Sequence, residues 1–329
     1  MTQGLVYVSD SDPGITRRRA GKGFCYFSPG GQRLSGALCA RAVALAVPPA
    51  WEQVWICPRE DGHIQATGRD ARGRKQYLYH PLWQASRAET KYAGLTDFAR
   101  ALPALRRRLD RDLRQEAGNR DFTLAALVML LDRAWLRIGN PEYTAQNGSF
   151  GAVTLRRRHL RLDEDSVRLD FRAKGGRRVR QVLRDRKLHR ILHQIGDLPG
   201  RNLFTWLDED GRPCPLGTGD VNGYLAEAMG EGVTARTFRT WGGTLAAFGR
   251  AAEEPLTIRA MAGAAALRLH NTPAICRSSY IHPAVLDLAA LDAPARQDRL
   301  SGLNPPDTPG LRAPERRLLS FLDTTETRR

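Results

Sequence analysis

Residues 76–114 read QYLYHPLWQASRAETKYAGLTDFARALPALRRRLDRDLR, and the spacing of the apolar residues changes within this stretch. Residues 76–79 form a short aromatic run that is typical of a strand. Further along, leucines recur at every third or fourth position, which is the period of one helix face: Leu102, Leu105, Leu109 and Leu113. The change of period near residue 82 predicts a β-rich unit followed by a mainly helical one.

The residues before this change predict a small β-rich domain over residues 1–82. Short runs rich in aromatic and β-branched residues are bounded by Gly, Pro and Asp, and they cover residues 23–27, 54–57, 63–67 and 76–79. One helix is expected over Ser35–Ala46, because the prolines that follow it at positions 48 and 49 would end it.

Residues 83–298 predict a larger, mainly helical domain that contains a small β-hairpin sheet. Apolar and polar residues alternate on both sides of residues 163–166, as in two strands joined by a turn. A second turn at residues 174–177 leads into another extended run. Helix N-caps are expected at three polar residues: Asp121, Asp220 and Thr234.

The last segment, residues 299–329, is rich in Pro, Gly and charge. This composition predicts a mobile tail with a short terminal helix. The fold class expected for the whole chain is therefore α+β, with a β-rich domain, a mainly helical domain and a tail.

The charge balance points to a polyanionic partner. The 329 residues include 51 Lys and Arg against 35 Asp and Glu, a formal net charge of +16. Such an excess favours association with nucleic acid, because neutralising phosphates releases counterions. A membrane is the competing polyanion, but apolar stretches such as Phe122–Leu131 are shorter than the ~18 residues that a spanning helix needs. We therefore expect a nucleic acid as the partner and no membrane association.

The cysteines and the N-terminus predict a cytoplasmic protein, and a DNA-binding protein in the cytoplasm is expected at the nucleoid. The five cysteines include no C-x-x-C pair and have no zinc-ligand spacing, so we expect reduced thiols and no metal site. The first twelve residues, MTQGLVYVSDSD, lack the basic start and apolar core of a secretory signal.

Four segments place a cation or a hydroxyl where chemistry is possible, and each also has a plainer interpretation. Arg137 follows an apolar helix, where a cation would complement the helix dipole. Lys174 lies in a turn, where it could be a solvated charge or a proton donor, and the two glycines beside it would let the backbone pass close to a ligand. Arg236 and Arg239 share one helix face and could simply contact phosphates. Tyr280, before Ile-His-Pro, could be a half-buried packing residue.

Taken together, these segments resemble the active site of type IB DNA topoisomerases in their compact bacterial and poxvirus-type form. The resemblance runs from about Gly14 to Pro283 and includes PPAWEQVWI at residues 48–56 and GHIQATGRDARGRKQYLYH at residues 62–80. It implies a small β-rich domain that binds DNA and a helical catalytic domain, which close as a clamp around the duplex. A monomer is expected.

The resemblance also implies the roles of the catalytic residues. Arg137 and Arg239 would hold the non-bridging oxygens of the scissile phosphate, which suits the planar guanidinium group. Lys174 would protonate the leaving 5′ oxygen, and Tyr280 would be esterified to the 3′ phosphate. Because one phosphodiester is exchanged for another, neither ATP nor a metal cofactor is expected.

One position departs from the poxvirus and eukaryotic pattern. Asn271 stands where those enzymes have histidine, whereas bacterial members have asparagine at this position. An amide can donate a hydrogen bond to phosphate without titrating. His270 precedes it where bacterial relatives usually have glycine, so His270 is the alternative donor.

Further residues are predicted to contact DNA. In the N-terminal domain the strand QYLY and the basic residues before it suggest contacts to base edges or phosphates. Near the catalytic segments, other polar residues suggest phosphate contacts. The predicted DNA-contacting residues are Gln65, Arg69, Arg74, Lys75, Gln76, Tyr77, Tyr79, Asn140, Tyr143, Arg236 and Arg277.

Two other functions fit part of the sequence. A tyrosine site-specific recombinase shares the arginine, lysine and tyrosine chemistry, but recombinases carry histidine three residues before the second arginine, where this chain has Arg236. They also lack the β-rich segment at Arg74–His80. A non-catalytic DNA-binding protein would explain the charge but not the four catalytic segments together.

Overall fold

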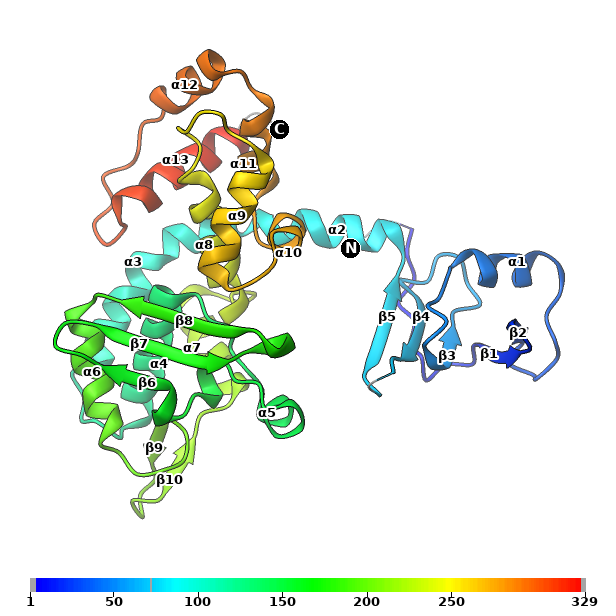
Figure 1. Cartoon of the computed structure of the whole chain (residues 1–329), viewed down its shortest axis with the longest axis horizontal. Coiled ribbons are helices and arrows are strands. Elements are labelled where there is room, and N and C mark those ends of the chain that lie inside the picture. Colours follow the sequence, from blue (N-terminus) through cyan, green and yellow to red (C-terminus); the bar gives the residue numbers. More distant parts are fainter. Residues whose placement is uncertain (1–3, 72, 327–329) are drawn as a thin grey trace. The chain divides into compact units, whose positions relative to one another are not determined.

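The computed structural model describes residues 4–71 and 73–326, which form two compact units, Met1–Ala93 and Gly94–Arg329 (Figure 1). The sequence predicted a boundary at residue 82, where the helical period begins. Helix α2 (Pro81–Ala93) does begin there, but it belongs to the first unit. The change of period marks the start of a helix, whereas the boundary between units depends on packing, so the two differ by one helix.

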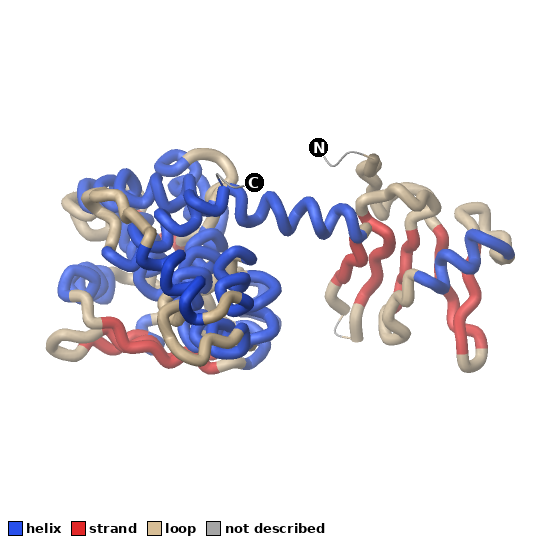
Figure 2. The backbone as a smooth tube through the Cα atoms, turned by 90° about the horizontal axis from the view of Figure 1, so that it is seen from above, coloured by secondary structure: helices blue, strands red, loops and turns tan. Residues whose placement is uncertain are grey.

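The N-terminal unit is an antiparallel sheet of five strands in the order β2-β1-β3-β4-β5. Its strands, which lie side by side in Figure 2, are β1 (Ile15–Ala20), β2 (Gly23–Phe27), β3 (Glu52–Ile56), β4 (Ile64–Arg69) and β5 (Lys75–Tyr79). Helix α1 (Gly36–Ala44) supplies the buried Ala42 to a small core that includes Ile15, Val54 and Ile56. The predicted helix and the predicted strands are confirmed.

Strand β1 was not predicted, because its sequence ITRRRA has no apolar alternation. Its central arginine is held by specific contacts instead. The Arg17 guanidinium lies 4.1 Å from the centre of the Phe24 ring and donates hydrogen bonds to the carbonyls of Val47, Pro48 and Trp51 at 2.7–2.9 Å. These hydrogen bonds to carbonyls of the connection between α1 and β3 hold Arg17 in the strand in place of apolar packing.

The C-terminal unit is mainly helical. Its helices are α3 (Leu95–Asp112), α4 (Arg120–Ala134), α5 (Pro141–Asn147), α6 (Arg186–Gly196), α7 (Thr218–Met229), α8 (Ala235–Phe248), α9 (Ile258–Leu269), α10 (Pro273–Ser279), α11 (Pro283–Leu286), α12 (Ala293–Ser301) and α13 (Ala313–Glu326). Helix α4 is buried on nearly all sides and forms the centre of the core. The mixture of small antiparallel sheets and helices confirms the α+β class.

A three-stranded sheet lies over α4 (Figure 1) and confirms the predicted hairpin and second turn. Its strands are β6 (Leu160–Leu162), β7 (Val167–Arg172) and β8 (Arg178–Leu183). The inward residues Val167, Leu169 and Phe171 are buried, while the alternate residues face solvent, so the period-two pattern explains the register. A separate pair of short strands is β9 (Thr205–Leu207) with β10 (Pro213–Pro215).

Two of the three predicted N-caps are wrong by a few residues. Asn119, not Asp121, caps α4, since its side chain accepts a hydrogen bond from the Asp121 amide at 2.8 Å. Asp220 lies inside the first turn of α7, where its carboxylate accepts the Gly217 amide at 2.7 Å. Acidic residues suit both the cap and the first turn, which is why the sequence did not separate the two positions. Thr234 is the N-cap of α8, as predicted.

The predicted mobility of the tail over residues 299–329 is also wrong, although the terminal helix that was predicted within it is present. Helix α13 packs on α3 and α8 and buries its apolar residues: Leu318, Leu319, Phe321 and Leu322. The Phe321 ring lies 5.1 Å from that of Phe248. The prolines and glycines belong to the connection before the helix, and they dominated the composition from which a tail was inferred.

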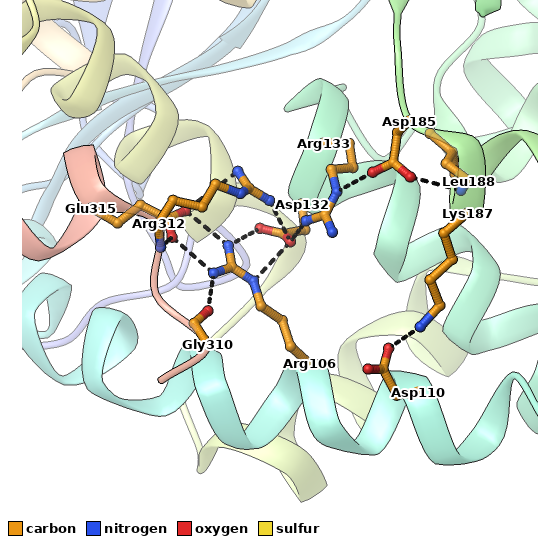
Figure 3. Close-up of polar contacts among 10 residues, drawn as sticks. All are labelled: Arg106, Asp110, Asp132, Arg133, Asp185, Lys187, Leu188, Gly310, Arg312 and Glu315. Carbon is orange, nitrogen blue, oxygen red and sulfur yellow. Dashed lines mark hydrogen bonds and ion pairs between the residues drawn. The ribbon is translucent and has the colours of Figure 1, made fainter. Parts of the chain in front are cut away.

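A buried network of charges holds α13 against the core (Figure 3). The Arg106 guanidinium donates to both carboxylate oxygens of Asp132 at 2.8 and 3.0 Å and to both of Glu315 at 2.8 Å. The two acidic side chains are 2% and 1% exposed. Burial alone would raise the pKa of Asp132, but Arg106, Arg312 and Arg133 outweigh this effect and hold that pKa below its ordinary value.

We expect Glu315→Ala to lower the free energy of unfolding by about 3–5 kcal/mol, because Arg106 would lose one of two buried partners. The measurement is urea denaturation at pH 7. Glu227→Ala is the control: it removes an exposed ion pair to Arg108 and should cost less than ~1 kcal/mol. Equal effects of the two substitutions would contradict the network's role. Because the pKa of Asp132 is lowered on folding, the network's stabilisation should be present above about pH 4 and lost as the pH falls further.

Candidate active site

One cleft in the C-terminal unit gathers most of the predicted catalytic residues. It has a volume of about 380 Å³, and we call it the Tyr280 cleft. Its lining residues are Arg137, Ile138, Gly139, Asn140, Tyr143, Ser149, Phe150, Lys174, Ala235, Arg236, Arg239 and Tyr280. This lining, taken from the described part of the chain, contains four cations and two phenols but no carboxylate. Its positive charge is therefore not neutralised from within the cleft.

Arg239 is built into the wall of the cleft by helix α8. The side chain is 3% exposed, and its guanidinium donates to the carbonyls of Trp135 at 2.5 Å and Leu269 at 3.0 Å, while Nε has no partner. These acceptors are neutral carbonyls, so they orient the guanidinium without neutralising its positive charge as a carboxylate would. Burial and the nearby Arg137 lower the pKa of Arg239 to about 10, which leaves it protonated at neutral pH. An anion in the cleft would relieve this repulsion.

Arg137 lies just beyond α4 rather than on its last turn. The helix ends at Ala134, and Trp135 adopts the left-handed conformation, with φ of 51°. The Arg137 side chain is half-buried and, within the described residues, makes no hydrogen bond or ion pair. Burial and the neighbouring Arg177 lower its pKa, although Tyr280 acts in the opposite direction. A desolvated arginine without a protein partner is suited to bind an incoming anion.

Tyr280 sits directly after α10 and packs on α8. A Cβ at Gly243 would lie 2.5 Å from the Tyr280 carbonyl oxygen and 3.0 Å from the Tyr280 Cβ, so only glycine permits this approach. Thr244 then donates to the Tyr280 carbonyl at 3.4 Å and accepts the His282 amide at 3.1 Å. Helix α8 therefore positions both Arg239 and the backbone of Tyr280. The Arg239 guanidinium carbon lies 5.1 Å from the centre of the Tyr280 ring.

Neither Gly243 nor Thr244 was predicted as a functional residue. The only signal in the sequence is a pair of glycines in the middle of a helix, at positions 242 and 243. Glycine there costs about 1 kcal/mol relative to alanine, and it therefore indicates a packing or functional requirement.

Lys174 enters the cleft from the turn between β7 and β8. Gly175 and Gly176 have φ of 74° and 77°, values that glycine adopts without strain, and they reverse the chain immediately after the lysine. The Lys174 side chain is exposed and, in the described part of the chain, has neither a hydrogen bond nor an ion pair. It is therefore free to reach a group bound in the cleft.

Asn271 is close to this site but does not line the Tyr280 cleft. It lines an adjacent hollow of about 560 Å³, together with His270, Arg177 and Arg178. The Asn271 side chain is 8% exposed; its oxygen accepts the Thr272 amide at 3.1 Å, and its Nδ2 has no partner. This amide donor is therefore available to an acceptor that binds in the hollow.

The flanking residues are divided between the cleft and the surface. Asn140, Tyr143 and Arg236 line the cleft, as predicted for phosphate contacts. Asn140 also caps α5, accepting the Glu142 amide at 2.7 Å, so its oxygen is already engaged. Arg277 is exposed on α10 and is not among the lining residues.

In the N-terminal unit, the prediction that Gln65 contacts DNA is wrong. Its side chain is 4% exposed, donates to the carbonyls of Glu60 at 2.9 Å and Gly62 at 2.7 Å, and accepts from Arg41 at 2.5 Å. All these partners are internal, so Gln65 stabilises the loop before β4. Sequence alone could not show which face of β4 it occupies, because apolar alternation around it is weak.

The other predicted contacts in this unit lie around β5. Tyr77 is 43% exposed and stacks on Tyr79 with ring centres 5.8 Å apart, which leaves an aromatic surface. The charged and amide residues are engaged within the unit: Arg69 with Gln53, Arg74 and Gln76 with Asp70, and Lys75 with Asp10 at 2.6 Å. These contacts are on or near the surface, so a phosphate could replace them.

Two further observations concern metals and membranes. Among the described residues, no three His, Cys, Asp or Glu side chains come close enough to hold a metal ion. Over the same residues, no helix combines the length and the apolar character required to cross a membrane.

Two family models and several known proteins match this chain. Residues 80–256 match the family model described as eukaryotic DNA topoisomerase I, catalytic core, and residues 23–70 match bacterial DNA topoisomerase IB, N-terminal domain. The chain is 30% identical over 237 residues to DNA topoisomerase 1B of Acanthamoeba polyphaga mimivirus, covering 70% of each chain. It is 20% identical over 104 residues to DNA topoisomerase 1B of Vaccinia virus, covering 32% of this chain and 33% of that protein. The chain belongs to the type IB DNA topoisomerase family.

Proposed function

We propose that this protein relaxes supercoiled DNA by cutting one strand at Tyr280, letting it rotate and resealing it. The observation that carries this proposal is the Tyr280 cleft, in which Tyr280 lies among four cations and no carboxylate. A phosphodiester is the ligand that such a cleft fits, and a phenol can attack it only if nearby cations stabilise the developing charge.

The reaction exchanges one ester for another. The Tyr280 oxygen forms a bond to phosphorus and loses its proton to water, while the bond from phosphorus to the 5′ oxygen breaks. Lys174 supplies the proton that this 5′ oxygen gains. The strand is then held by a 3′-phosphotyrosyl bond, and its free 5′ end rotates before the hydroxyl attacks back. Because the bond energy is conserved, the scheme uses no ATP.

Each cation has a position that suits its role. Arg239 and Arg137 hold the non-bridging oxygens: Arg239 is oriented by the Trp135 and Leu269 carbonyls, and Arg137 keeps its guanidinium unpaired. Lys174 reaches the cleft from the turn between β7 and β8, in which no described residue makes an ion pair with its ammonium group. Asn271 lies beside the cleft, and its unpaired Nδ2 donates a hydrogen bond to an oxygen of the scissile phosphate.

We also propose that the β-rich unit and the helical unit close as a clamp around the duplex, and that a monomer at the nucleoid is the active form. The exposed Tyr77, which stacks on the partly buried Tyr79, and the basic residues near β5 support a DNA-binding role for the first unit. The net charge of +16 supports strong phosphate binding.

The test is relaxation of a negatively supercoiled plasmid without ATP and with EDTA. The protein should relax the plasmid whatever its sequence. Inactivity under these conditions would contradict the proposal. Activity restricted to plasmids that carry paired specific sites would instead favour a recombinase, against which Arg236 already argues, because recombinases have histidine there.

Arg239→Ala should slow single-turnover strand cleavage on the order of 10²–10³-fold, because the transition state loses a preorganised donor pair. DNA affinity should change only a few-fold, since one phosphate contact among many is removed. The matched control is Arg236→Ala, which lines the same cleft but is exposed at the start of the same helix. A smaller cleavage defect for Arg239→Ala than for the control would show that burial on α8 is not what orients the phosphate.

A further inference from the structure

The hollow beside the Tyr280 cleft has the features of a second site for a sugar-phosphate unit. Its rim carries Arg177 and Arg178 from the start of β8 and His270 and Asn271 from the connection between α9 and α10. Its remaining lining is small or apolar: Gly263, Ala266, Leu267 and Pro273. Leu267 is 79% exposed, so an apolar surface lies open to solvent beside cations.

The charges on this rim differ in availability. Arg178 is tied to Asp170 by two hydrogen bonds of 2.6 and 3.0 Å. The exposed Arg177 side chain, by contrast, makes no hydrogen bond or ion pair in the part of the chain that the structure describes. Arg177 is therefore the cation that an anion in this hollow would meet unpaired.

His270 occupies a position where its backbone is strained. It ends α9 in the left-handed conformation, with φ of 49°, which costs about 1 kcal/mol or more for a residue with a Cβ. Glycine would remove this cost. A side chain kept at such a position, on the rim of a cationic hollow, suggests that the imidazole itself has a use there.

The hollow is immediately next to the catalytic arginines. Arg177 is close enough to Arg137 to lower the pKa of Arg137. The pKa of His270 is lowered by burial and, to a smaller extent, by the charges of Arg239 and Arg137. The turn that carries Lys174 into the Tyr280 cleft continues directly into Arg177. A strand that places one phosphate in the cleft can therefore bring its neighbour to this rim.

We propose that Arg177 and His270 form a second anion subsite that holds the backbone phosphate next to the scissile phosphate, with the deoxyribose against Ala266 and Leu267. The subsite rests on the proposed function, since it assumes that the scissile phosphate occupies the Tyr280 cleft. Its effect is to fix the position of the strand on both sides of the reacting phosphorus, so that the Tyr280 oxygen is held in line with the leaving oxygen.

The experiment uses a duplex on which the wild-type cleavage position has been mapped. A series of duplexes then carries a single uncharged methylphosphonate at each phosphate near that position. Single-turnover cleavage is measured for wild type, Arg177→Ala and His270→Gly. The glycine variant relieves the backbone strain at position 270, so a loss of function cannot be assigned to unfolding.

At one position adjacent to the cleaved phosphate, the methylphosphonate should slow the wild type about tenfold, the value of one charge-assisted contact. It should slow Arg177→Ala and His270→Gly by clearly less than this, because they already lack part of the contact. The matched control is Arg161→Ala, which removes an exposed arginine on β6. The methylphosphonate should slow cleavage by this variant as much as it slows cleavage by wild type.

Two outcomes would overturn the subsite, and they are distinguishable. If wild type cleaves but the substitution and the methylphosphonate have additive effects at every position, the subsite is wrong and the proposed function stands. If wild type cleaves none of the duplexes tried, so that no cleavage position can be mapped, the proposed function fails, and the subsite fails with it.

Discussion

Tyr280→Phe should lower the rate of plasmid relaxation by at least about 10⁴-fold, because it removes the only atom that forms the covalent bond in the proposed scheme. The backbone and the ring remain, so the close approach of the residue 280 carbonyl and Cβ to Gly243 and the contact of the ring with Arg239 should persist. Affinity for duplex DNA and thermal stability should therefore stay close to those of wild type. The measurement is relaxation over a wide range of enzyme concentration, together with DNA binding by fluorescence anisotropy.

The matched control is Tyr143→Phe, since Tyr143 lines the same cleft but lies exposed on α5. We expect a loss of only a few-fold, consistent with one lost phosphate contact. Relaxation by Tyr280→Phe at the wild-type rate would remove Tyr280 from the mechanism. Abolition of activity by Tyr143→Phe alone would mean that the wrong phenol had been assigned.

Lys174→Ala should slow strand cleavage by about 10²–10⁴-fold, the usual contribution of a positioned general acid. The turn should keep its shape, because Gly175 and Gly176 set its backbone and the lysine side chain is exposed. DNA affinity should fall only slightly, since the lysine is one of many cations near the duplex.

A substrate with sulfur in place of the leaving 5′ oxygen isolates this role. A thiolate departs without protonation, so Lys174→Ala should cleave this substrate at nearly the wild-type rate. Arg239→Ala is the control. The sulfur substrate should not restore its cleavage rate, because Arg239 contacts the non-bridging oxygens and not the leaving oxygen. An equal defect of Lys174→Ala on the oxygen and sulfur substrates would show that Lys174 is not the acid.

The parts of the fold that could be predicted from the sequence are those in which one face of an element is buried. The alternation around residues 163–166 and the leucines of α3 report burial directly, and both the hairpin and the helix are present. Strand β1 has no such pattern, since Arg17 is held by carbonyls from a distant connection. The terminal helix α13 was predicted, but its packing on the core was not, because its partners, such as Phe248 and Arg106, are far away in the sequence.

The candidate site shows the same limit. Arg137, Lys174, Arg239 and Tyr280 were found from their sequence contexts, and the structure brings all four into one cleft. What the sequence could not supply is how they are held. Arg239 depends on two carbonyls from other segments, and Tyr280 depends on the close approach that Gly243 allows. Such contacts join residues that are tens of positions apart, and no local pattern records them.

Gln65 and Asn271 illustrate how tertiary contacts change an assignment. Gln65 has the residue type of a DNA contact, but its side-chain donors and acceptor are already used in hydrogen bonds within the unit. Asn271 was expected within the catalytic cleft, yet its unpaired amide belongs to the hollow beside it. In both cases the hydrogen-bonding capacity that is already used decides what a polar side chain can do.

The central claim, a covalent bond between Tyr280 and the 3′ end of a cut strand, is tested most directly by trapping that bond. A duplex whose leaving strand is too short to stay paired is incubated with the protein, the reaction is stopped with detergent, and the adduct is digested and mapped by mass spectrometry. We predict a peptide that carries Tyr280 linked through a 3′ phosphate. Absence of an adduct, attachment at another residue or linkage to a 5′ phosphate would contradict the account.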